Sequence, residues 1–201
     1  MTEDLSVTCP SCEEGLLDIK SILYSVPYFN ELAMFTMTCP KCNFSHNDVF
    51  SAEQRPPMRR VLNVDRRDLM QTRVVRSGSG TIRMPDFGID VEPGPNAESF
   101  ISNIEGVLQR TISVVETAIR FAETDGQREE GTDVLELLQK AVNGEMPFTL
   151  IIEDPAGVSA ILPDNLSLVS REELTKEEAS RLKGAPAWLE VARQDLDERK
   201  G

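Results

Sequence analysis

The cysteines of the chain form two matched C-x-x-C pairs, each with proline after the first cysteine. This spacing lets two thiolates bind one metal ion from a tight turn, and two such turns complete a tetrahedral site of four sulfurs. Sulfur ligands in this geometry suit zinc far better than hard cations. The sequence therefore predicts one structural Zn²⁺, in a closed site without a coordination position for water or substrate, held by Cys9, Cys12, Cys39 and Cys42.

The spacing leaves three other uses of the cysteines open. Two disulfides would require an oxidising compartment, and a rubredoxin-like iron site shares the tetrahedral S4 geometry. A thioredoxin-like redox pair would place one C-x-x-C motif near a βαβ unit. The N-terminus, residues 1–4, is acidic and lacks the apolar run of a secretory signal, which indicates a reducing, cytoplasmic location and favours zinc.

Composition restricts the class of partner. The 201 residues, 40% of them hydrophobic, suit one medium domain with a small appendage, and no apolar run approaches the roughly 20 residues of a membrane span. A net charge of −13 argues against general nucleic-acid binding, which needs a surface that neutralises phosphates. Residues 55–83 nevertheless hold eight arginines, and their role is either a solvent-facing strand surface or a contact with an acidic or RNA-coated partner. A nucleic-acid-binding zinc ribbon of the transcription or translation machinery is therefore the alternative function.

Catalytic motifs are missing from the sequence. There is no Walker loop, dinucleotide fingerprint or nucleophile elbow, and the chain has a single histidine, His46. This residue lies four positions beyond Cys42, and we expect it to face solvent because the four thiolates already complete a zinc site. The sequence predicts a protein that is not an enzyme.

The segment between the cysteine pairs has the pattern of a β-hairpin. Residues 16–26 are rich in β-branched and apolar side chains, Pro27 interrupts them, and residues 30–38 alternate in a second strand that leads into Cys39. Residues 1–54 are therefore expected to form a zinc-ribbon finger. Tyr28 and Phe29 follow Pro27, where they either pack within the protein or form an aromatic contact for a partner.

Several separated motifs resemble the ZPR-type zinc-finger proteins. The first cysteine pair precedes Val26-Pro27-Tyr28-Phe29, and the second is followed by Asn47. Val75-Arg76-Ser77 stands before Ile82-Arg83-Met84-Pro85, and residues 148–157 resemble the family's strand ending in Asp-Asp-Pro-Ser-Gly. The chain has room for one copy of a module that eukaryotic members carry twice. Ser45-His46-Asn47-Asp48 departs from the family's basic residue followed by Asn-Asn-Glu.

The resemblance implies a mainly β fold with some helix, in which the zinc ribbon precedes a jelly-roll-like β domain. It also implies a partner, because family members bind translation elongation factor 1-alpha and act as a chaperone for its folding. A non-catalytic zinc-binding adaptor or folding factor for such a GTPase is thus the expected function. Pro27, Tyr28, Phe29 and Asn47 are the partner-binding candidates.

The rest of the chain divides into a β domain over residues 55–168 and a charged helical tail over residues 169–201. The β domain is predicted to carry strands over residues 60–65, 72–76, 81–84, 87–91 and 148–152, the last of them buried and central. Residues 158–162 are expected to close a hairpin with that central strand.

A helical hairpin is predicted within residues 97–143. Its helices are expected over residues 97–123, with Asn96 as N-cap, and over residues 132–143. In the tail, Thr175 begins a capping box, and a last helix is expected from Pro186, with Trp188 on its apolar stripe.

Overall fold

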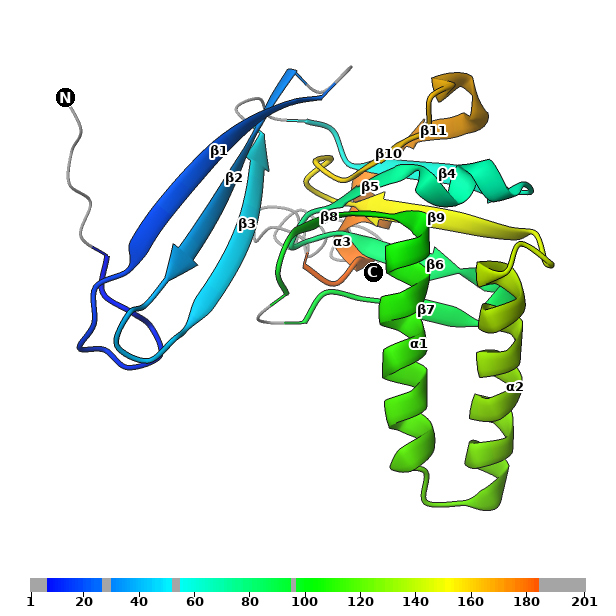
Figure 1. Ribbon diagram of the computed structural model, residues 1–201. Helices are drawn as coiled ribbons and strands as arrows, with labels where there is room; N and C mark the ends of the chain where they lie inside the picture. The colour runs from blue at the N-terminus through cyan, green and yellow to red at the C-terminus, as the bar shows by residue number, and fades with distance from the viewer. Residues whose placement is uncertain (1–6, 27–29, 52–54, 95–96, 185–201) are drawn as a thin grey trace, which may run out of the picture.

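The computed structural model describes residues 7–26, 30–51, 55–94 and 97–184. They form two parts, a three-stranded ribbon that holds the cysteines and a larger body that begins at residue 55 (Figure 1). The partner-binding candidates Pro27, Tyr28 and Phe29 lie outside the described residues, as does the expected last helix with Trp188. Among the described helices, none is both long and apolar enough to cross a membrane.

The ribbon contains the two strands that the sequence predicts and a third. β1 (Asp18–Val26) pairs antiparallel with β2 (Asn30–Thr38), and β2 pairs antiparallel with β3 (Ser45–Ser51), in the order β1-β2-β3. The β1–β2 register runs without interruption through nine residue pairs. β2 is therefore the central strand, and β3 is the edge nearer the body (Figure 1).

The larger sheet of the body is antiparallel throughout, with strand order β11-β4-β9-β6-β7. Its strands are β4 (Met58–Val64), β6 (Thr81–Met84), β7 (Ile89–Val91), β9 (Phe148–Asp154) and β11 (Val169–Glu173). The continuous apolar run of β9 places it at the centre of the sheet, as the sequence predicts.

A smaller antiparallel sheet shares the core and has the order β10-β5-β8. Its strands are β5 (Arg73–Arg76), β8 (Phe100–Asn103) and β10 (Ala160–Leu162). The expected hairpin between residues 148–152 and 158–162 is wrong, because β10 pairs with β5 and not with β9. Gly157, with a φ of +68°, turns the chain away from the first sheet into the second.

The helical hairpin is present, but both helices begin elsewhere than predicted. α1 (Ile104–Arg120) starts after Asn103, whose Oδ1 accepts a 2.8 Å hydrogen bond from the Gly106 amide. The expected start at residue 97 with Asn96 as N-cap is therefore wrong, because residues 100–103 pair with β5 as strand β8. Their apolar side chains extend the helical periodicity into a segment that the sheet holds extended.

The second helix begins seven residues earlier than expected, as α2 (Asp125–Val142). Thr124 forms a capping box with Gln127, so Asp125 and Gly126 lie in the first turn of this helix. Gly144 follows the helix with a φ of +74°, as a C-terminal glycine should.

The core lies between the larger sheet and the near halves of α1 and α2. Helix residues that are fully buried come from the start of α1 and the end of α2, such as Leu108 and Leu138. The far halves project beyond the sheets (Figure 1). The buried helix residues of the near halves pack against the inward side chains of the larger sheet, which include Leu62, Ile82, Met84, Leu150 and Ile152.

Short helical segments complete the body. Three 3₁₀ turns lie at η1 (Arg67–Gln71), η2 (Pro85–Phe87) and η3 (Leu166–Leu168). α3 (Lys176–Arg181) follows the predicted capping box, in which Thr175 Oγ1 accepts from the Glu178 amide.

Candidate metal centre

The ribbon folds the four cysteine sulfurs into one cluster. The ligand atoms all lie within 4.8 Å of one another, with Cys9 and Cys42 Sγ 3.6 Å apart and Cys12 and Cys39 Sγ 3.8 Å apart. Four sulfurs placed tetrahedrally at the usual zinc–sulfur distance of about 2.3 Å are separated by about 3.8 Å. The donor set and its spacing therefore fit Zn²⁺, held by all four thiolates.

The two cysteine turns have the same backbone geometry. The carbonyl of Cys9 accepts a 2.9 Å hydrogen bond from the amide of Glu13, and the carbonyl of Cys39 accepts one of 2.9 Å from the amide of Asn43. Glu13 and Asn43, each the residue after a pair, are left-handed, with φ values of 57° and 59°. Two matched turns thus face each other and aim their thiolates at one point.

Gly15 is a residue of the centre that the spacing rules do not reveal. A Cβ placed on it would lie 2.6 Å from Cys39 Sγ, closer than real Cβ contacts allow. Its carbonyl accepts a 2.7 Å hydrogen bond from the Cys9 amide. The sequence signal is a glycine three positions after Cys12, where the backbone must pass beside the opposite pair.

Backbone amides donate hydrogen bonds to cysteine sulfurs of this site and favour their thiolate form. Hydrogen bonds from the amides of Glu14 and Gly15 lower the pKa of Cys12 to about 6. The Phe44 amide acts on Cys42 in the same direction, but burial and the three other sulfurs outweigh it and raise the pKa of Cys42 to about 11. Four thiolates at neutral pH therefore need the positive charge of a bound metal.

The other predicted site residues occupy different places. The His46 ring stacks on Phe44 with 6.4 Å between ring centroids, and the metal-type cluster found among the described residues consists of the cysteines alone. Pro27, Tyr28 and Phe29 lie outside the described residues, so their role in partner binding stays a prediction.

Asn47 joins the ribbon to the body. Its Oδ1 accepts from Thr36 Oγ1 at 2.8 Å, its Nδ2 donates to Glu98 Oε2 at 3.3 Å, and its carbonyl accepts from the Ser99 amide at 3.1 Å. The neighbouring Asp48 accepts from Ser99 Oγ at 2.9 Å. These contacts give Asn47 an internal role, while its predicted contact with a partner stays a prediction.

Buried Asp154 organises the body side of this junction. Its carboxylate is fully buried and accepts from Ser79 Oγ at 2.7 Å, Ser77 Oγ at 2.9 Å, the Ala156 amide at 2.9 Å and the Ser159 amide at 2.6 Å. The carboxylate thus holds the Ser77–Gly80 turn, where a Cβ on Gly78 would lie 3.8 Å from Asp48 Oδ1. An aspartate before a proline usually caps only its own turn, whereas Asp154 also holds this distant segment.

The arginines of residues 55–83 do not form one surface. Arg60 and Arg76 are buried, with 5% and 6% exposure, whereas Arg59 and Arg83 bracket Glu153, each with Nε 2.7 Å from one carboxylate oxygen. The expectation of a solvent-facing strand surface therefore fails for the two buried arginines. These two ion pairs belong to an ionic row that crosses the five-stranded sheet. The row consists, in order, of Glu172, Arg59, Glu153, Arg83 and Asp90.

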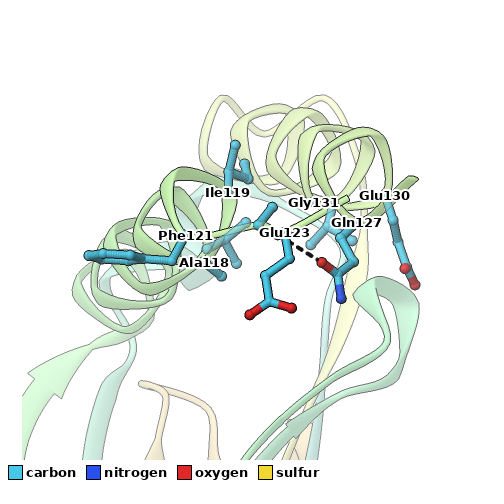
Figure 2. A pocket seen from close by; sticks show the side chains of 10 residues that line it. Ala118, Ile119, Phe121, Glu123, Gln127, Glu130 and Gly131 are labelled. Atoms are coloured by element: carbon cyan, nitrogen blue, oxygen red, sulfur yellow. Dashed lines mark hydrogen bonds between the residues drawn. The ribbon is translucent and has the colours of Figure 1, made fainter. Parts of the chain in front are cut away.

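A hollow of about 660 Å³ lies between the far halves of α1 and α2 (Figure 2). Apolar side chains such as Ile119 and Phe121 line it, and Glu123 and Glu130 stand among them (Figure 2). Gly131 lets the helices approach, since a Cβ there would lie 2.7 Å from Ile119 Cγ1. The other lining side chains are mainly apolar, with Gln127 as a further polar one.

Comparisons with known proteins agree with this architecture. Residues 2–57 match the ZPR1 zinc-finger domain, and residues 67–184 match the ZPR1 jelly-roll domain. A ZPR1-like protein of Methanocaldococcus jannaschii is 40% identical over 176 residues, which cover 87% of each chain. One of Pyrococcus horikoshii is 38% identical over 182 residues, which cover 89% of this chain and 80% of that protein.

A eukaryotic relative is longer than this chain. The zinc finger chaperone zpr1 of Schizosaccharomyces pombe is 29% identical over 159 residues, which cover 76% of this chain and 34% of the relative. The predicted resemblance and mainly β fold class are confirmed. The chain belongs to the ZPR1 family, with a zinc-finger domain followed by a jelly-roll domain.

Proposed function

We propose that the protein is a non-catalytic, zinc-dependent folding factor that binds a GTPase of the translation elongation factor 1-alpha type. The observation that carries the proposal is the closed four-sulfur centre in a family where one relative is named a chaperone. Four thiolates leave zinc without an open position for a substrate, so the metal organises a surface.

Charge supports a basic protein partner. The chain has a net charge of −13, and an acidic binder is complementary to a GTPase that handles tRNA. Four of the eight arginines that would favour nucleic acid are engaged within the body, since Arg59 and Arg83 contact Glu153, and Arg60 and Arg76 are buried. A protein partner therefore fits the described surface better than a phosphate backbone does.

The ribbon is the part we assign to the partner. Its junction with the body runs through Asn47 and Asp48, which form hydrogen bonds with Glu98 and Ser99. Tyr28 and Phe29 lie between β1 and β2 in the sequence, and aromatic side chains dominate many protein interfaces. We therefore expect these aromatics to contribute to the contact.

A refolding assay tests the proposal. Denatured elongation factor 1-alpha is diluted into buffer with the zinc-loaded protein, and native GTPase is measured by nucleotide binding. We expect a higher yield with the wild type and little gain with the double variant Tyr28→Ala, Phe29→Ala. The double variant Val114→Ala, Phe121→Ala removes two exposed apolar side chains outside the ribbon and serves as the matched control.

Pull-down with the native GTPase gives the second measurement. Absence of both binding and assisted refolding with the wild type would contradict the proposed partner. Equal activity of the aromatic and control variants would remove Tyr28 and Phe29 from the interface. Tight RNA or DNA binding with a steep salt dependence would instead support the nucleic-acid alternative.

A further inference from the structure

Exposed apolar side chains concentrate in the N-terminal part of the ribbon. Seven large hydrophobic side chains are exposed among the residues described by the structure, and two of these, Val114 and Phe121, lie on the helical hairpin. The other five belong to β1 or to the segment that leads into it, and they are Val7, Leu16, Ile19, Ile22 and Leu23. At 63% and 66% exposure, Ile22 and Leu23 leave most of their surface in water.

β1 is also the outer edge of its sheet. β2 pairs with its inner side. Thr8 bridges to Leu16, and the Leu17 amide donates to the Val7 carbonyl, just before β1; within residues 7–26, 30–51, 55–94 and 97–184 no strand pairs with the outer side of β1 itself. The edge faces away from the body, while β3 lies on the body side (Figure 1). Backbone amides and carbonyls along such an edge are available for another strand.

The usual protection of an edge strand is weak here. Natural edges carry bulges, prolines or several charges that oppose strand addition. β1 contains no proline, pairs with β2 through nine consecutive residues without a bulge, and has Asp18 and Lys20 as its charged residues. The edge is therefore long, regular and suited to accept a strand.

Each face of this edge carries at least one exposed apolar side chain. Successive side chains of a strand point to opposite faces, so Ile22 and Leu23 lie on different sides of the ribbon. The register places Ile22 opposite Met34, which packs against the body, and places Ser21 opposite Phe35. A partner that covered one face would leave either Ile22, or Ile19 and Leu23, in water, whereas an added strand brings side chains to both faces.

We propose that β1 binds an extended segment of the client as a fourth, hydrogen-bonded strand of the ribbon. The segment carries apolar side chains with lysine or arginine near them, because the ribbon is acidic. Its residues 7–51 contain five acidic residues against Lys20 and Lys41, and Lys41 is already ion-paired with Glu14. This inference rests on the proposed function and specifies which form of the client is bound, a strand that is not yet paired in its own fold.

A peptide with defined backbone chemistry tests the strand addition. The probe is a ten-residue peptide of alternating valine and threonine with lysine at both ends. Its control has the same sequence with alternate amides N-methylated, which removes donors from one edge. We expect the zinc-loaded full chain to bind the probe, and the methylated peptide to bind at least about tenfold more weakly.

Two variants locate the site. Ile22→Ser with Leu23→Ser should weaken probe binding about tenfold, since exposed side chains are lost without a change in the buried core. Val114→Ser with Phe121→Ser removes an equally exposed pair elsewhere and should leave binding unchanged. Hydrogen exchange should slow in β1 on probe binding, because its outer amides gain acceptors.

Other results would overturn the inference. Equal binding of both peptides, equal loss in both variant pairs, or unchanged exchange in β1 would each exclude a strand added at this edge. A dimer of the free protein that dissociates in the Ile22→Ser, Leu23→Ser variant would assign the edge to a second copy. Assisted refolding of the elongation factor without probe binding would refute the strand addition alone, whereas probe binding without any effect on the elongation factor would refute the proposed function alone.

Discussion

The ribbon and the body are held together by different means. The body has a core of buried apolar side chains from two sheets and two helices, whereas the only buried hydrophobic residues described in the ribbon are Cys9 and Cys39. A bound metal can replace a hydrophobic core in so small a unit. The ribbon can therefore stay folded while Ile22 and Leu23 remain exposed for contact.

Removal of zinc should cause the largest difference in stability between the ribbon and the body. Structural zinc sites contribute roughly 10–16 kcal/mol of apparent binding free energy, so the ribbon should unfold in excess chelator while the body stays folded. Hydrogen exchange followed by mass spectrometry would show fast exchange over β1–β3 and continued protection of β9. The variant Cys39→Ser should reproduce the effect, because it removes a buried ligand.

The same experiment shows whether the ribbon and the body are stabilised independently. Simultaneous loss of protection in β9 would show that the body depends on the ribbon for its stability. Protection of β1–β3 that survives metal removal would show that strand pairing alone holds the ribbon.

Replacement of Asp154 by asparagine should have the next largest effect, this time on the body. The fully buried carboxylate accepts four hydrogen bonds, and an asparagine in its place would turn an acceptor into a donor that faces other donors. We expect a loss of about 2–4 kcal/mol in the free energy of unfolding, measured with urea. Asp164→Asn, at an exposed loop, should change it by less than about 0.5 kcal/mol.

The ionic row predicts how body stability depends on pH. Burial raises the pKa of Glu153, but hydrogen bonds from Arg83 and Arg59 outweigh it and lower the pKa below its usual value of 4.5. A lowered pKa in the folded state stabilises the fold above pH 4.5, and this contribution is lost as the pH falls through the folded-state pKa. Glu153→Gln should therefore cost roughly 1–2 kcal/mol at pH 7 and much less at pH 3.

Urea unfolding at both pH values measures this difference. Glu172→Gln changes a more exposed partner of Arg59 and is the control, with a small effect at either pH. A cost of Glu153→Gln that is equal at pH 7 and pH 3 would show that its role is packing rather than charge.

Local patterns in the sequence predict the parts of the molecule that are determined locally. The two C-x-x-C pairs predicted the sulfur cluster, the continuous apolar run predicted the central position of β9, and the capping box at Thr175 predicted the start of α3. In each case neighbouring residues supply the ligands, the hydrophobic face or the cap, so the pattern contains the physical cause.

Features that depend on distant segments were missed. Phe100 and Ile101 fit a helical period, yet pairing with β5 holds them extended. Asp154 stands before Pro155, where a carboxylate usually caps only its own turn, but Ser77 and Ser79, whose hydroxyls it binds, lie more than seventy positions away. Gly15 is required by the sulfur of Cys39 on the opposite turn, a contact that spacing within one pair does not reveal.

The junction between ribbon and body gives the smallest predicted effect on stability. Ser99→Ala removes the 2.9 Å hydrogen bond to Asp48 but keeps the backbone bond from the Ser99 amide to the Asn47 carbonyl. We expect a cost of about 1 kcal/mol in the free energy of unfolding. The ribbon should also gain rotational freedom relative to the body, which NMR relaxation would detect as different correlation times for the two parts.

The outcome decides what fixes the orientation of the ribbon. If the two correlation times stay equal in Ser99→Ala, the side-chain bond is dispensable, and the backbone bond together with Met34 packed on the body holds the ribbon in place. If they diverge while zinc stays bound, Asp48 and Ser99 restrain an otherwise independent finger. In that case the variant should bind an isolated strand peptide as the wild type does, yet assist refolding less, because only refolding would require β1 to stand at a fixed angle to the body.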